Sequence, residues 1–100
     1  MRGGVTIGNN VTLSREVIVL TTSLKTNDYL NECVKQYRDH EKKAVFIGDG
    51  TWCATRAIIC PGAYIPEKCI IASGAVVVGT LDESGCLYGG VPARKIKKLT

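Results

Sequence analysis

The chain has 100 residues, enough for one domain, but a chain this short buries a smaller fraction of its surface than a 150-residue domain does. Thirteen Lys and Arg against nine Asp and Glu make it mildly basic, which alone excludes no class of partner. With five Cys, no Cys-x-x-Cys pair and one His, the spacing of zinc ligands is absent. An odd number of cysteines without a signal peptide indicates reduced thiols, and no apolar run is long enough to span a membrane. We therefore expect a cytoplasmic protein.

Residues 7–24 repeat every six positions. The hexads IGNNVT, LSREVI and VLTTSL each begin with a bulky apolar residue. A period of six is not helical, and a single strand alternates every two residues, so this pattern indicates short strands that are each followed by a turn. Turn-forming residues recur along the whole chain where a positive φ would be useful, at Gly8, Asn9, Asn10, Gly48, Asp49, Gly62 and Gly74.

The repeat is interrupted at residues 25–46, a segment longer than structureless loops usually are. Leu30, Cys33, Val34 and Tyr37 recur at helical spacing and predict one or two amphipathic turns. We expect this insertion to carry a function or a small element of its own.

The hexads resume at Ile47 and continue to residue 82, with bulky apolar residues at most first positions and small residues at most fifth positions. Three hexads make one triangular coil, which predicts coils at 7–24, 47–64 and 65–82. Stacking these coils aligns two columns, Ile7 with Ile47 and Ile65, and Val19 with Ile59 and Val77. A C-terminal extension follows at residues 83–100, and its last nine residues, PARKIKKLT, hold four positive charges.

This pattern predicts an all-β fold, a parallel β-helix of about three coils in a single domain at residues 1–100. The alternative is a small β-sandwich with coincidental spacing, which is disfavoured because nine hexads keep one frame on both sides of the interruption. Burying a large apolar side chain contributes about 1.5–3 kcal/mol, whereas ordering one residue costs on the order of 1.5 kcal/mol. Because many inward positions hold small residues and the ends of a repeat array need caps, we expect a homo-oligomer.

The stretches IGDGTWCATRAIICPGAYI, IIASGAVVVGT and GGVPARKIKKL resemble the hexapeptide-repeat acyltransferases, most closely the maltose, galactoside and polysaccharide O-acetyltransferase branch. The resemblance runs from Ile7 onward and matches only the C-terminal half of these longer proteins. It implies a left-handed β-helix that assembles as a trimer and transfers an acetyl group from acetyl-CoA to a sugar hydroxyl. In related trimers the insertion reaches the neighbouring subunit and walls the acceptor site.

Acetyl transfer needs a base that takes the proton of the acceptor hydroxyl. Related enzymes supply a His where the chain leaves the repeat, and the matching stretch here is LTTSLKTND. One alignment places that His at Thr22 and a shifted frame places it at Leu24, and neither residue can act as a base at neutral pH. His40 is the remaining candidate, because an imidazole has a pKa of about 6.5. The alternative for His40 is a solvated loop residue between charged neighbours.

The resemblance also implies residues that bind CoA. Trp52 matches a Trp that borders the acceptor and thioester cleft, although an aromatic packed at a coil corner is an equal alternative. Ala54 and Ser73 match small residues whose backbone lies along the pantetheine arm, and Val78 stands where relatives often carry Thr.

The basic C-terminal extension supplies the remaining predicted contacts. Arg94 and Lys97 match basic residues near the adenosine phosphates of CoA, which pair well with Arg and Lys. The alternative is a solvated basic tail.

Other functions fit the sequence less well. A non-catalytic trimeric protein that binds CoA or is purely structural remains the main alternative, since the usual base is missing. The carbonic-anhydrase-like enzymes of the same fold need three His ligands, and nucleic-acid binding would need a broad basic face with stacking aromatics. We therefore expect no metal, no nucleic acid and a sugar or polysaccharide as the acceptor.

Overall fold

The computed structural model describes residues 4–24 and 40–99. The amphipathic turns predicted at Leu30, Cys33, Val34 and Tyr37 lie outside the described residues. The described part contains no helix, and so none that is long and apolar enough to cross a membrane. Its strands are β1 (Val5–Ile7), β2 (Thr12–Leu13), β3 (Ile18–Val19), β4 (Thr22–Leu24), β5 (His40–Lys42), β6 (Val45–Ile47), β7 (Trp52–Cys53), β8 (Ile58–Ile59), β9 (Tyr64–Ile65), β10 (Ile70–Ile71), β11 (Val76–Val77), β12 (Cys86–Gly89) and β13 (Arg94–Lys98).

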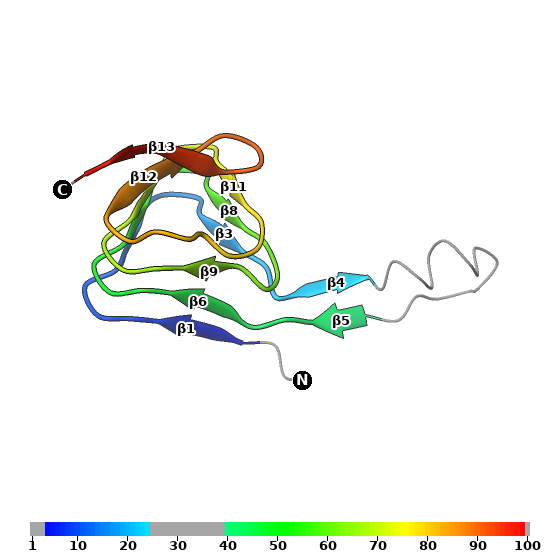
Figure 1. Cartoon of the computed structure of the whole chain (residues 1–100). Helices are drawn as coiled ribbons and strands as arrows, with labels where there is room; N and C mark the ends of the chain where they lie inside the picture. Colours follow the sequence, from blue (N-terminus) through cyan, green and yellow to red (C-terminus); the bar gives the residue numbers. More distant parts are fainter. Residues whose placement is uncertain (1–3, 25–39, 100) are drawn as a thin grey trace.

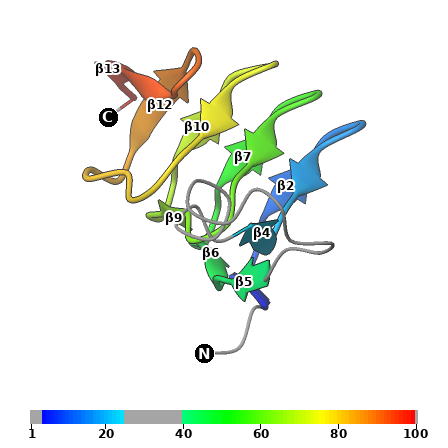
Figure 2. The same cartoon turned by 90° about the vertical axis from the view of Figure 1, so that its right-hand side faces the viewer.

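The strands form three faces around a triangular interior, and within each face the stacked strands run parallel (Figure 1). The first face contains β1, β6 and β9, the second contains β2, β7, β10 and β12, and the third contains β3, β8 and β11. The chain visits the first, second and third faces in turn, and Figure 2 shows the strands of the second face as successive steps. The fold is a parallel β-helix, as the hexads predict, and it is left-handed, as the resemblance implies.

The register of the strands confirms the predicted columns. Ile7 lies opposite Ile47, which in turn lies opposite Ile65 on the first face. On the third face the same alignment joins Val19, Ile59 and Val77. Strands β1 and β6 begin two residues before the first positions of their hexads, so part of the predicted insertion 25–46 belongs to β6.

Each corner of the triangle is a tight turn that repeats from coil to coil. At the corner between the first and second faces, Asn10, Gly50 and Lys68 all have positive φ, at 59°, 70° and 57°. Of the positions predicted to have positive φ, Asn10, Gly62 and Gly74 have it, whereas Gly8, Asn9, Gly48 and Asp49 do not. A Cβ at Gly48 would lie 2.6 Å from the backbone nitrogen of Glu67, so this position needs Gly because two coils approach closely.

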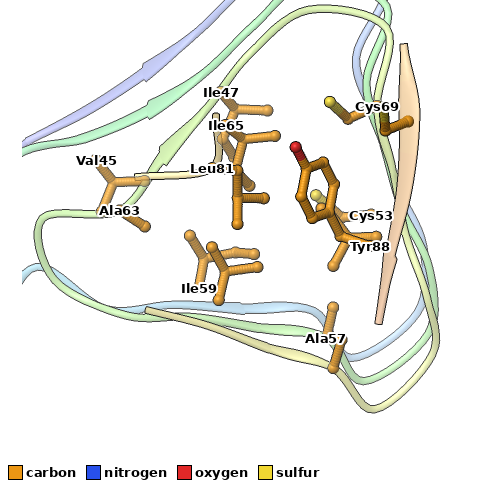
Figure 3. Packing of buried hydrophobic residues seen from close by; sticks show 14 residues of the cluster. Val45, Ile47, Cys53, Ala57, Ile59, Ala63, Ile65, Cys69, Leu81 and Tyr88 are labelled. Carbon is orange, nitrogen blue, oxygen red and sulfur yellow. The ribbon is translucent and has the colours of Figure 1, made fainter. Parts of the chain in front are cut away.

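The core consists mainly of inward side chains from the second and third coils, together with Val45, Cys86 and Tyr88 (Figure 3). Ile47 and Ile65 stack in one column and are fully buried. Among the residues that the structure describes, one polar residue is buried, Thr51. Its hydroxyl donates to the carbonyl of Pro66 at 3.0 Å. Tyr88 closes the interior at the C-terminal end, where it is 4% exposed.

Two additions decorate this helix. Strand β13, formed by the predicted basic tail, pairs antiparallel with β12 at the edge of the second face. Strands β4 and β5 form an antiparallel ribbon that extends from the corner between the third and first faces (Figure 1). The ribbon is closed at its base by a hydrogen bond from the amide of Lys43 to the carbonyl of Thr21, at 2.8 Å.

Candidate functional site

The β4–β5 ribbon carries the predicted base. Its register places Leu24 opposite His40 and Thr22 opposite Lys42. The backbone of His40 is thus the direct cross-strand neighbour of Leu24, one of the two positions that the resemblance gives for the catalytic His. The imidazole of His40 lies outside the described part of the structure.

Trp52 stands at an outward position of the second face and is 45% exposed. Its indole nitrogen donates to the hydroxyl of Ser14 on the preceding coil, at 2.7 Å. This bond joins residues 38 positions apart and fixes the ring orientation across two strands. The sequence prediction missed Ser14. The register provides a signal, since Trp52 faces Thr12 and Ser14 is two positions further along the same side.

Trp52 and Lys97 lie in one row of the second face. Cα partners run from Trp52 to Ile70, from Ile70 to Leu87 and from Leu87 to Lys97. Adjacent strands lie about 4.8 Å apart, so this row places Lys97 at about 14 Å from Trp52. The predicted thioester end and phosphate end of the CoA site therefore share one face.

Ala54 and Ser73 lie at the corner between the second and third faces, on neighbouring coils. Ala54 is 8% exposed, and its amide donates to the carbonyl of Ile71 at 2.9 Å. Ser73 is exposed and lines a hollow of about 540 Å³ together with Thr55, Gly74 and three charged residues, Arg15, Glu16 and Arg56. Because Arg56 is held by Glu16 at 2.7 Å, the side chain of Arg15 is the cation here without an ion-pair partner among the described residues.

Val78 lies at a different corner, between the third and first faces, and is 58% exposed. Backbone hydrogen bonds align the same corner on the three coils. The amide of Cys60 donates to the carbonyl of Val77 at 3.0 Å, and the amide of Leu20 donates to the carbonyl of Ile59 at 2.8 Å. This is also the corner from which the β4–β5 ribbon extends. Val78 therefore lies at another corner of the triangle than Ser73.

Strand β13 carries Arg94, Lys95, Lys97 and Lys98, and all four side chains are exposed. Glu83 binds two of them, with its carboxylate 2.9 Å from the ammonium of Lys95 and 3.4 Å from that of Lys98. The hydrogen bond from Lys95 lowers the pKa of Glu83, and the same bond raises the pKa of Lys95. Among the residues that the structure describes, Arg94 and Lys97 have no acidic partner.

Two of the buried thiols, those of Cys53 and Cys69, are poor nucleophiles. Burial raises the pKa of Cys53 to about 11, and burial likewise raises that of Cys69. A thiol with such a pKa is almost entirely protonated at neutral pH. In residues 4–24 and 40–99, no three His, Cys, Asp or Glu side chains gather as a metal site.

Comparisons with known proteins bear on the sequence and the fold of the chain. No protein-family model matches the chain. It is 26% identical over 95 residues to the galactoside O-acetyltransferase of Escherichia coli (strain K12), which covers 95% of this chain and 44% of that enzyme. A hexapeptide-repeat acetyltransferase of Vibrio cholerae O1 biovar eltor, solved with acetyl coenzyme A, gives a TM-score of 0.84 at 26% identity over 96% of this chain and 50% of that one. Galactoside acetyltransferase in complex with coenzyme A gives 0.84 at 24% identity, over 96% and 46%.

The chain thus spans about half the length of the relatives that it matches. The resemblance predicted from its hexads and from its Gly-Val-Pro-Ala-Arg stretch is confirmed: in sequence and in fold, the chain is similar to the hexapeptide-repeat acetyltransferases.

Proposed function

We propose that this protein is a cytoplasmic, homotrimeric O-acetyltransferase that uses acetyl-CoA to acetylate a hydroxyl of a sugar or polysaccharide. The similarity to galactoside O-acetyltransferase over 95% of the chain supports the reaction class. A base takes the proton of the acceptor hydroxyl while the oxygen bonds to the acetyl carbonyl carbon. The carbon–sulfur bond to CoA then breaks, and the CoA thiolate takes up the proton.

The second face suits the donor. Arg94 and Lys97, which have no acidic partner among the described residues, would bind phosphate groups of CoA, since Arg and Lys form charge-assisted bonds to phosphate. Trp52 stands further along the same face, at a place where an indole could border the thioester. Ser73 and Ala54 leave room for the backbone to approach the pantetheine arm at the adjoining corner.

One observation carries the proposal: the ribbon and the donor face lie on opposite sides of the triangle. The ribbon leaves the corner between the third and first faces, whereas Trp52 and Lys97 lie on the second face, which is opposite that corner. This arrangement favours a site in which the base and the thioester-binding face come from different chains. In a trimer, the ribbon of one subunit would meet the second face of the next, and each site would take residues from two chains.

His40 is the proposed base. Its backbone lies across from Leu24, so the ribbon offers this His at the same end of the coil where the resemblance expects one. At neutral pH an imidazole with an ordinary pKa is mostly neutral and can accept the hydroxyl proton.

A second function remains: a trimeric protein that binds CoA without turnover, or is purely structural. The observation in its favour is that Thr22 and Leu24 occupy both positions expected for the base. In the CoA-binding form of this alternative, the second face would still bind CoA, but no acetyl group would be transferred.

Two measurements on the same preparation separate the candidates. Isothermal titration would give the Kd for CoA, and an acetyl-transfer assay would test a panel of mono- and oligosaccharides. We expect H40A to lower kcat/KM by about 10²–10⁴ with the Kd for CoA unchanged. K42A, two residues along the same strand, is the matched control and should stay within about twofold of the native rate.

A third variant tests the position. L24H, which returns a His to the position matched by the shifted alignment, should restore activity in the H40A background. Binding of CoA with no turnover, unaffected by H40A and by L24H, would favour the second function. If sedimentation shows a folded monomer at micromolar concentration, the proposal of a site shared between subunits is wrong.

A further inference from the structure

Glu83 divides the cations of β13 into two classes. Its carboxylate oxygens bind Lys95 and Lys98 at 2.9 and 3.4 Å, one oxygen to each ammonium. Arg94 and Lys97 are left without an acidic partner within the described part of the chain. The motif singles out Arg94 and Lys97 by resemblance alone, whereas the ion pairs of Glu83 make the same division from the geometry of this fold.

The backbone of Glu83 is held in place by the hydroxyl of Tyr88. The hydroxyl of Tyr88 accepts a hydrogen bond from the amide of Glu83 at 2.9 Å and donates one to its carbonyl at 2.8 Å. Because Tyr88 is 4% exposed and anchored in the core, the loop that carries Glu83 is fixed relative to β12. The backbone from which the carboxylate reaches Lys95 and Lys98 is therefore anchored to the core.

The same carboxylate borders a hollow of about 310 Å³ that Arg94 and Lys95 also line. Asp82 contributes a second acidic side chain, so the formal charges around the hollow cancel. A phosphate that entered here would meet Arg94 but would also face two carboxylates. Replacing Glu83 by a neutral residue would make the hollow positive and release two ammonium groups.

We propose that Glu83 is a specificity-determining residue that acts as a built-in competitor for phosphate. By holding Lys95 and Lys98, it restricts the phosphate-binding cations of β13 to Arg94 and Lys97 and lowers the affinity of this strand for polyanions in general. That the polyanion is CoA rests on the proposed function. The electrostatic restriction itself rests only on the ion pairs.

The first test uses E83Q with three probes: CoA, inorganic tripolyphosphate and pantetheine, which has no phosphate. Exposed ion pairs of this kind contribute modestly, so we expect the Kd for CoA and for tripolyphosphate to fall about three- to tenfold at low salt. The gain should disappear near 0.5 M salt, where the screening length is only about 4 Å, and pantetheine binding should not change. D82N removes an equal charge from the same hollow without touching the ion pairs, and its effect should stay below about twofold.

The second test replaces each of the four cations in two backgrounds, the native protein and E83Q. In the native background, K95Q and K98Q should alter the Kd for tripolyphosphate by less than about twofold, whereas R94Q and K97Q should weaken binding about three- to tenfold. In the E83Q background, K95Q and K98Q should weaken binding as strongly as the other two, a coupling that a double-mutant cycle measures directly.

Three results would overturn the proposal. The first is an equal loss of tripolyphosphate affinity for R94Q, K95Q, K97Q and K98Q in the native background. The others are no gain in affinity for E83Q at low salt, or an equal gain in affinity for D82N. If the native protein does not bind CoA but the pattern with tripolyphosphate holds, only the proposed function fails. If CoA binds and the pattern is absent, the role of Glu83 fails.

Discussion

The first coil and the second coil have the same hexad pattern and very different burial. Ile7 and Ile47 are register partners in one column, yet Ile7 is 46% exposed and Ile47 is fully buried. Leu13 and Cys53, partners on the second face, differ in the same way, at 42% and 0%. A hexad therefore decides which way a side chain points, whereas the neighbours in the stack decide whether that side chain is buried.

The two ends of the helix also differ. At the C-terminal end, Tyr88 fills the interior and β13 covers the edge of β12. At the N-terminal end of the described residues, β1, β2 and β3 are outermost, each paired on one side only. The first coil should consequently contribute less to stability than the second, residue for residue.

The largest expected effect compares I47A with I7A. Truncating a fully buried Ile removes apolar contacts and leaves a cavity, so I47A should lower the free energy of unfolding by about 2–5 kcal/mol. I7A removes the same atoms from a half-exposed site and should cost about 1 kcal/mol or less. Urea denaturation followed by circular dichroism measures both. Equal losses would mean that the first coil is covered in solution, for instance by another subunit.

A smaller effect is expected at the fifth positions of the hexads. Val11 in the first coil corresponds to Thr51 in the second, where the hydroxyl donates to the carbonyl of Pro66. T51V keeps the shape and leaves that carbonyl without its partner, so the free energy of unfolding should fall by about 1–3 kcal/mol.

V11T is the matched control, since a half-buried hydroxyl in the first coil can reach water and should be nearly neutral. Chemical denaturation of both variants gives the comparison. If T51V is as stable as the native chain, the hydrogen bond at the second coil contributes nothing and burial alone distinguishes the two coils.

The sequence predicts the helix well because one period controls it. Apolar residues at every sixth position align into columns, and the pairing of Ile7 with Ile47 follows from counting alone. The reason for Gly48 could not be predicted, because the close approach of Glu67 depends on how two coils pack. The β4–β5 ribbon was not predicted: β5 lies in the predicted insertion, whereas β4 takes the last residues of the predicted first coil 7–24.

The candidate site was harder to predict than the fold. Motifs point to Trp52, Arg94 and Lys97, and the structure aligns the first and last of these on one face. The sequence does not single out Ser14 or Glu83, because their roles come from contacts between segments that lie apart in the chain. Residues that act through a neighbour leave no local pattern.

The smallest expected effect contrasts the ion pairs of the two regions as pH changes. The bond from Lys95 lowers the pKa of Glu83, so the stability from this pair is fully present above the ordinary pKa of 4.5 and is lost as the pH falls through the lowered value. The difference in Tm between the native protein and E83Q should thus be small and positive at pH 7 and vanish well below pH 4.5. E16Q is the control at the other end of the helix, since it breaks the pair between Glu16 of the first coil and Arg56 of the second. A Tm difference for E83Q that persists unchanged in acid would show that Glu83 stabilises the C-terminal end through its shape, and the charge of the carboxylate would then contribute nothing to holding β13 in place.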